Sequence, residues 1–122
     1  MKSQAQFISV TPVLPSADIA RDIDWYGKHV GFDHLFSDKM YAGLKRENIL
    51  IHLQWHADTP DDPLLGGSVI KIFVQDVDLI FDEMVARKTV APDKLRRNTP
   101  WGTHEFGFYD LNNNAIFFVE DV

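Results

Sequence analysis

Three polar side chains recur at every second position of one apolar segment. His52, Gln54 and His56 therefore project from one face of an extended strand, and the residues between them project from the other face. An imidazole ring can donate or accept a hydrogen bond, bind a metal ion or transfer a proton near neutral pH. His52 and Gln54 are candidate ligand-binding residues, with a hydrogen-bonded structural role as the alternative for His52. His56 lies near the strand end, where we expect it to be exposed.

A lysine interrupts a second apolar segment. Lys71 lies between Ile70 and Ile72, which are expected to cover a helix, so its side chain projects from the opposite face. A lysine in this position contacts a ligand, pairs with a carboxylate or extends to solvent. We treat Lys71 as a candidate ligand-binding residue. Glu105 is a second candidate, because it could balance either Lys71 or a cationic ligand.

Aromatic side chains supply the remaining candidates. Trp101 lies between a proline and a glycine, and therefore in a loop, where a core residue is less expected. Phe36, Trp55 and Phe117 lie in or beside predicted strands. These side chains could form an aromatic cleft for a ligand, with packing in the core as the alternative.

The composition excludes several kinds of chemistry. The 122 residues include no cysteine, so the chain has no thiolate nucleophile, disulfide or cysteine-bound zinc. It contains no phosphate-binding glycine loop and no GxSxG nucleophile motif. The formal net charge of −6 disfavours nucleic acid and makes a cationic small molecule a more natural ligand. Lys94, Arg96 and Arg97 form too short a basic cluster to change this, and we expect them in a solvated loop.

No targeting or membrane segment is evident. The first residues lack the long apolar run of a secretory signal, and no segment approaches the ~18 apolar residues that a membrane span requires. We therefore expect a cytoplasmic protein with no membrane partner.

The elements that position these candidates follow from hydrophobic periodicity. Before residue 57 the pattern predicts four strands and one helix: the strands over 7–14, 33–38, 40–45 and 49–55, and the helix over 16–30. Ser16 or Asp18 can cap this helix, and Gly31 can take the left-handed conformation that ends it. Residues 57–67 are rich in Asp, Pro and Gly and are predicted to be a linker.

After the linker the pattern repeats. The sequence predicts strands over 68–74, 104–110 and 115–120, a helix that Asp76 caps, and a short strand near Leu95. Asparagines in the turn at 111–114 tolerate positive φ. The halves, 7–56 and 68–120, both run strand, helix, strands. We predict a single domain over 1–122 with an α+β fold, in which two βαβββ repeats form one curved mixed sheet with a cleft.

Several segments resemble a known family when taken in this order. LPSAD at 14–18, WY at 25–26 and VGF at 30–32 resemble the opening of the vicinal oxygen chelate superfamily, which includes glyoxalases, extradiol dioxygenases and bleomycin-resistance proteins. VQDV at 74–77 resembles its entry to the second helix. WGTHEF at 101–106 and DLNNN at 110–114 resemble its C-terminal motifs. The resemblance covers nearly the whole chain and implies the same fold.

The resemblance also implies where a metal ion would be bound. In the metal enzymes of this superfamily, two histidines and one or two carboxylates hold a divalent ion. The corresponding positions fall on Thr11, Val69 and Phe117, with a fourth near His52. Because valine and phenylalanine side chains have no ligand atom, we predict no metal and no other cofactor.

The chain is most similar in type to the bleomycin-resistance proteins, which implies that Trp101 stacks on planar rings of a drug. The expected function is metal-independent binding and sequestration of a cationic or aromatic antibiotic, such as a cationic glycopeptide, in the cleft of a homodimer. No catalytic residue is expected. The alternative is a metal-dependent lyase or dioxygenase with relocated ligands, drawn from His52, His56, His104 and Glu105. A binding or regulatory module with no drug ligand is a third possibility.

Overall fold

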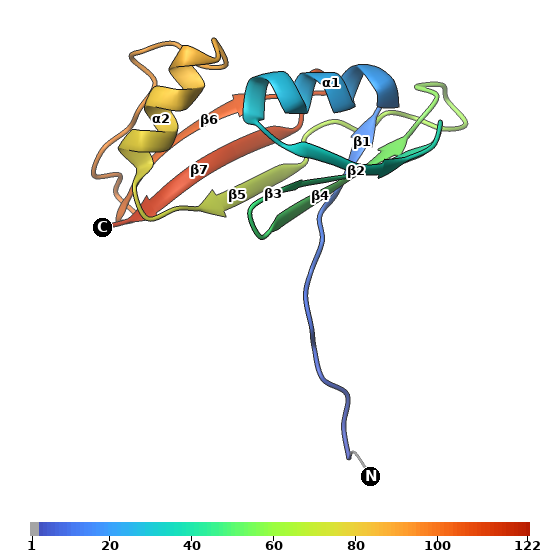
Figure 1. Cartoon of the computed structure of the whole chain (residues 1–122), viewed down its shortest axis with the longest axis horizontal. Helices are drawn as coiled ribbons and strands as arrows, with labels where there is room; N and C mark the ends of the chain where they lie inside the picture. The colour runs from blue at the N-terminus through green and yellow to red at the C-terminus, as the bar shows by residue number, and fades with distance from the viewer. Residues whose placement is uncertain (1–2) are drawn as a thin grey trace.

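The computed structural model describes residues 3–122 and has two helices on one side of two β-sheets (Figure 1). The first half forms a four-stranded sheet in the order β1 (Val13–Ser16), β4 (Ile49–Trp55), β3 (Tyr41–Arg46) and β2 (Asp33–Ser37). The second half forms a three-stranded sheet in the order β5 (Val69–Phe73), β7 (Ala115–Asp121) and β6 (Thr103–Tyr109). Helix α1 (Ile19–Val30) packs on the first sheet and α2 (Val77–Ala86) packs on the second.

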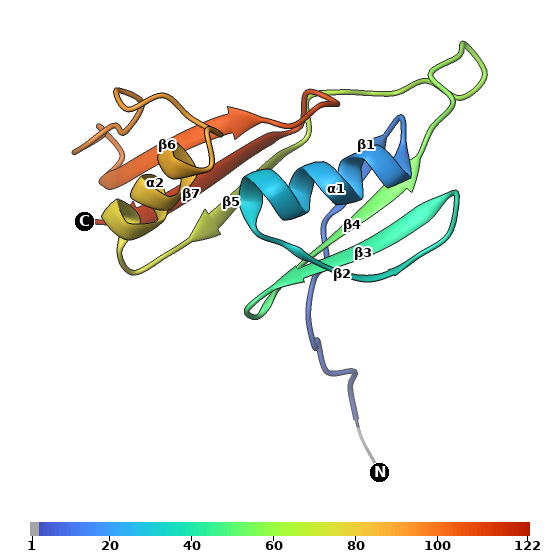
Figure 2. The same cartoon turned by 45° about the horizontal axis from the view of Figure 1, so that its top comes forward.

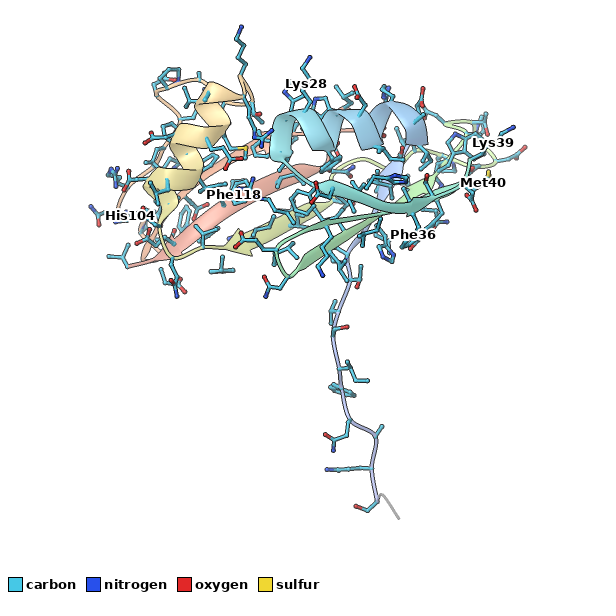
Figure 3. The ribbon with its side chains drawn as sticks, in the orientation of Figure 1. Lys28, Phe36, Lys39, Met40, His104 and Phe118 are labelled. Atoms are coloured by element: carbon cyan, nitrogen blue, oxygen red, sulfur yellow. The ribbon has the colours of Figure 1, made fainter. Side chains whose placement is uncertain are left out.

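The α+β fold of two related repeats is confirmed, with two differences from the prediction in the sheets and a third at the N-terminus. The strands form two separately hydrogen-bonded sheets, which Figure 2 shows side by side, and not one continuous sheet. The strand expected near Leu95 is reduced to one antiparallel bridge between Arg96 and Glu105. In both halves the first strand pairs in parallel with the last, and the last pairs antiparallel with the strand before it. This shared pairing places equivalent residues at equivalent points of the two sheets.

The N-terminal segment is where the strand prediction was wrong. The first strand begins at Val13, and residues 3–12 leave the body on the side opposite the helices (Figure 1). Phe7, Ile8 and Val10 are almost completely exposed. The alternating apolar residues suit a strand, but a strand also needs a hydrogen-bonding partner. Among the described residues, backbone pairing of this segment with β4 begins at Pro12, whose carbonyl accepts the His52 N–H at 2.9 Å.

The two helices begin in different ways. The Asp18 side chain accepts the Arg21 N–H at 3.1 Å, and Gly31 ends α1 with φ 76°, both as predicted. Asp76 stands before α2 but makes no capping hydrogen bond through its side chain. Instead the first N–H of α2, from Val77, donates to Glu120 of β7 at 2.8 Å. The capping group comes from a distant strand, which local sequence does not reveal.

Side chains from β3 and from the second half satisfy the carbonyl groups at the C-terminal end of α1. Arg46 donates to the last carbonyl of the helix at 2.9 Å, and Arg87 and Thr89 donate to the three carbonyls before it. Glu83 holds both guanidinium groups in place, at 2.7 Å from Arg46 and 2.8 Å from Arg87. The hydrogen bonds from Arg46, aided by Arg87 and opposed by partial burial, lower the pKa of Glu83 to about 2.

A buried polar network joins α1 to the turn between β6 and β7. The Tyr26 hydroxyl donates to Asp110 at 2.6 Å, and the backbone N–H groups of Asn112 and Asn114 donate to the same carboxylate at 2.8 and 2.9 Å. Burial, with the charge of Asp110, raises the pKa of Tyr26. The Asn112 side chain donates to Asp22 of α1 at 2.7 Å. The network fixes the turn against the helix.

Apolar residues of both halves form one core between the helices and the sheets. Trp25 of α1 and Phe108 of β6 lie with their ring centroids 6.3 Å apart, across the boundary between the halves. Among residues 3–122, no helix is long and apolar enough to cross a membrane.

Candidate functional site

The face of each sheet that the helices leave open carries most of the predicted site residues. On the second sheet, Lys71 of β5 is the register partner of Phe117 of β7, which in turn pairs with Gly107 of β6. The Phe117 ring lies over Gly107, where a Cβ atom would come within 2.6 Å of it. Glycine at position 107 therefore lets the aromatic ring lie flat on the sheet.

Trp101 and Glu105 are joined directly. The indole Nε1–H of Trp101 donates to Oε1 of Glu105 at 2.6 Å, and the Thr103 hydroxyl donates to the same oxygen at 2.6 Å. Trp101 is 54% exposed, whereas Glu105 is only 2% exposed. The buried carboxylate thus fixes an exposed indole ring, and among the described residues nothing bonds to its second oxygen.

The charge of Glu105 is stabilised by its neighbours. Burial alone would raise the pKa of Glu105, but the hydrogen bonds from Thr103 and Trp101 and the positive charges of Lys71 and Arg96 outweigh it. The pKa of Glu105 consequently lies below its ordinary value. The site contains an ionised carboxylate at neutral pH.

A cavity of about 470 Å³ lies beside this pair. Glu105, Gly107 and Phe117 form its strand side, and Val90, Lys94 and Arg96 line it from the preceding loop. Most of the lining is apolar, and the volume falls in the range typical of small-molecule sites. Trp101 does not line the cavity itself but contacts two residues that do.

Arg96 is a site residue that the sequence analysis missed. Its guanidinium carbon lies 5.2 Å from the centroid of the Trp101 ring, within the range of a cation–π contact. From the sequence, Arg96 was expected in a solvated loop, because its basic cluster with Lys94 and Arg97 is short. The predicted short strand near Leu95 was the available signal, since pairing with the next strand brings Arg96 beside Glu105.

A second group lies on the open face of the first sheet. The His52 ring accepts or donates a hydrogen bond at 2.9 Å with the hydroxyl of Tyr41, a residue the sequence analysis did not select. Phe36 packs edge-to-face on His52 with the ring centroids 5.4 Å apart, and it covers Gly43 as Phe117 covers Gly107. Gln54 is exposed and is the register partner of Tyr41.

These two groups do not form one site within a single chain. The cavity includes Glu105 and Phe117 but none of the candidates from the first sheet. Trp55 lies on the opposite face of β4, packs against the core and donates its indole N–H to the Ala17 carbonyl at 3.1 Å. The candidates therefore divide into the group of Phe36, His52 and Gln54, the group of Lys71, Trp101, Glu105 and Phe117, and the separate Trp55.

The residues at the superfamily's metal positions do not fit a divalent ion. Val69 and Phe117 offer no ligand atom, and within residues 3–122 no three His, Cys, Asp or Glu side chains come together. Two other histidines that were considered as relocated ligands have different partners: His56 pairs with Asp62 at 2.7 Å, and His104 accepts the Asn98 N–H at 2.9 Å. No step through a metal can be derived from these side chains.

Several known proteins are similar to this chain in sequence and in fold. No family model matches the chain. A bleomycin resistance protein of Geobacillus stearothermophilus is 23% identical over 125 residues, which cover 91% of this chain and 95% of that protein. The bleomycin-binding protein of bleomycin-producing Streptomyces verticillus, solved with copper(II)-bleomycin, is 24% identical with a TM-score of 0.73, covering 94% of this chain and 97% of that one. The bleomycin resistance determinant of transposon Tn5 is 17% identical with a TM-score of 0.78, covering 94% and 98%.

These similarities establish the fold of the chain. The chain has the fold of the glyoxalase, bleomycin resistance protein and dioxygenase group, and its sequence is similar to that of a bleomycin resistance protein. Within that group, all three of these similar proteins are described as bleomycin resistance or bleomycin-binding proteins.

Proposed function

We propose that this protein binds an aromatic or cationic antibiotic of the bleomycin type and sequesters it, without a metal ion and without catalysis. The observation that carries the proposal is the exposed Trp101 ring, which Glu105 holds beside a largely apolar cavity of about 470 Å³. A rigid, exposed aromatic ring is a suitable stacking surface for a planar ligand. The second oxygen of Glu105 would accept a hydrogen bond from an N–H group of that ligand.

We also propose that the binding cleft forms between two copies of the chain. Phe7, Ile8 and Val10 extend into solvent, and exposed apolar segments of this kind typically mark an interface. The outer edges of β1, β2 and β5 have no strand partner among the described residues. In a symmetric dimer, the first-sheet group of one chain could face the second-sheet group of the other, which one chain alone does not achieve.

Replacing Trp101 with alanine is expected to weaken bleomycin binding about tenfold or more, because truncating a central aromatic contact typically costs that much. Isothermal titration calorimetry of the purified protein with bleomycin measures the affinity and the stoichiometry. We expect one bleomycin per chain.

Trp55→Phe is the matched control, since Trp55 lies on the opposite face of its sheet and should leave the affinity unchanged. Far-UV circular dichroism checks that both variants are folded. Absence of bleomycin binding to the wild-type chain contradicts the proposed function, and equal binding by Trp101→Ala contradicts the proposed site.

Deleting residues 3–10 is expected to convert the dimer into a monomer, because it removes the exposed apolar side chains that the partner would cover. Sedimentation velocity at low micromolar concentration measures the oligomeric state. A full-length variant with serine at positions 7, 8 and 10 keeps the chain length and should behave like the deletion. A monomeric wild-type chain, or a deletion variant that remains dimeric, would contradict the proposed interface.

A further inference from the structure

The guanidinium group of Arg96 lies over the indole ring of Trp101, the ring proposed above as the stacking surface for a ligand. We infer that Arg96 sets the charge preference of this surface, so that the ligand ring stacking on Trp101 is neutral and any cationic group of the ligand lies elsewhere. The inference rests on the proposed function, since it concerns the same site.

The backbone of Arg96 is held in place independently of its side chain. The Arg96 N–H donates to the Glu105 carbonyl at 2.9 Å, and the Arg96 carbonyl accepts the Glu105 N–H at 2.8 Å. This pair forms the antiparallel bridge that stands in place of a further strand. Because these bonds are made by the backbone, the Arg96 side chain can be changed without removing the bridge.

The Trp101 ring is constrained on its edge and on one face. Its Nε1–H is bound to Glu105, and the Arg96 guanidinium carbon lies 5.2 Å from the ring centroid. The ring is nevertheless 54% exposed. The free area of the indole is therefore available for a planar ligand, which would share the ring with the guanidinium group.

The Arg96 guanidinium group changes which ligand charge the exposed part of the Trp101 indole favours. The faces of an aromatic ring carry negative charge density and attract cations. Arg96 already makes this contact, and a second cation stacked on the same ring would lie well within the Debye length of about 10 Å, where like charges repel. The negative charge of Glu105 is already compensated. Trp101 and Thr103 donate hydrogen bonds to its carboxylate, and the positive charges of Lys71 and Arg96 act on it. A neutral ring avoids the repulsion and keeps the stacking.

Two probes of nearly equal shape test this inference: isoquinoline, a neutral ring at pH 8, and N-methylisoquinolinium, a permanent ring cation. Quenching of tryptophan fluorescence gives a Kd for each. We expect the wild-type chain to favour isoquinoline by about threefold. In Arg96→Gln the preference should fall to equality or reverse, because the freed indole and Glu105 would then attract the cation.

Two variants serve as controls. Arg96→Lys keeps the positive charge and should keep the preference for the neutral ring. Arg97→Gln removes a neighbouring charge that pairs with Asp78 and does not contact the indole, so it should also keep the preference. Thermal unfolding verifies that all three variants retain the fold.

The outcomes separate the inference from the proposed function. Equal Kd values for the two probes in the wild-type chain, or an unchanged ratio of Kd values in Arg96→Gln, would overturn the role of Arg96. Neither result would contradict the proposed function, which the bleomycin titration tests. Failure of either ring to bind would overturn the inference as well, whereas the proposed function depends only on the bleomycin titration.

Discussion

Replacing Asp110 with alanine should lower the free energy of unfolding by about 3–5 kcal/mol, in the range observed when a buried polar network is broken. The carboxylate is 5% exposed and accepts four hydrogen bonds, from the Tyr26 hydroxyl, the Asn112 backbone, and the backbone and side chain of Asn114. Alanine would leave all four donors buried without an acceptor. Urea denaturation followed by circular dichroism measures the change.

Two further variants make this result specific. Tyr26→Phe removes only one donor and is expected to cost about 1–2 kcal/mol, because the other three bonds to Asp110 remain. Asp121→Ala at the exposed end of β7 should change the stability by less than about 0.5 kcal/mol. A loss below 1 kcal/mol in Asp110→Ala would show that the network contributes little.

Glu105→Gln is expected to weaken bleomycin binding by about ten- to a hundredfold, the range for removing a charged hydrogen-bond partner. Glutamine keeps the shape of the side chain but loses the negative charge that accepts the hydrogen bond of Trp101 and that would interact with the bound ligand in the proposed site. Calorimetry at pH 7 compares the variant with the wild-type chain. Glu47→Gln, at an exposed turn, is the matched control and should bind as the wild-type chain does.

The lowered pKa of Glu105 also predicts how the stability of the fold depends on pH. The stabilisation that the carboxylate gives the folded state is fully present above 4.5, the ordinary glutamate pKa, and is lost as the pH falls through its lowered folded value. The difference in unfolding free energy between wild type and Glu105→Gln should therefore be constant from about pH 6 to 8 and shrink below about pH 4. A difference that grows on acidification would mean that the pKa of Glu105 is raised in the folded state.

The sequence predicted elements well where the determinants are local. Asp18 and Gly31 bound α1 as expected, because a cap and a left-handed glycine act within a few residues. The strand over 7–14 was wrong because an alternating pattern shows that a segment can form a strand but not whether a partner is present. The cap of α2 was missed because Glu120 lies 43 residues away from the N–H that it accepts.

In the candidate site, too, contacts between residues close in sequence were predictable and contacts that depend on distant strand pairing were not. Trp101 and Glu105 are four residues apart in one motif, and they are in contact. Arg96 was expected in a solvated loop as part of a short basic cluster, whereas its position depends on pairing with Glu105 of β6. The separation of Phe36 and His52 from Trp101 depends on which sheet each strand joins, and no local pattern contains that information.

The arginine contacts at the end of α1 have a consequence for how the chain folds. The last carbonyls of this helix find donors only when β3 and the segment at 87–89 are in place. An α1 helix in the isolated first repeat would therefore have a frayed C-terminal turn. Although the chain is built as an internal duplication, its repeats are thermodynamically coupled, and the domain should unfold in a single cooperative transition.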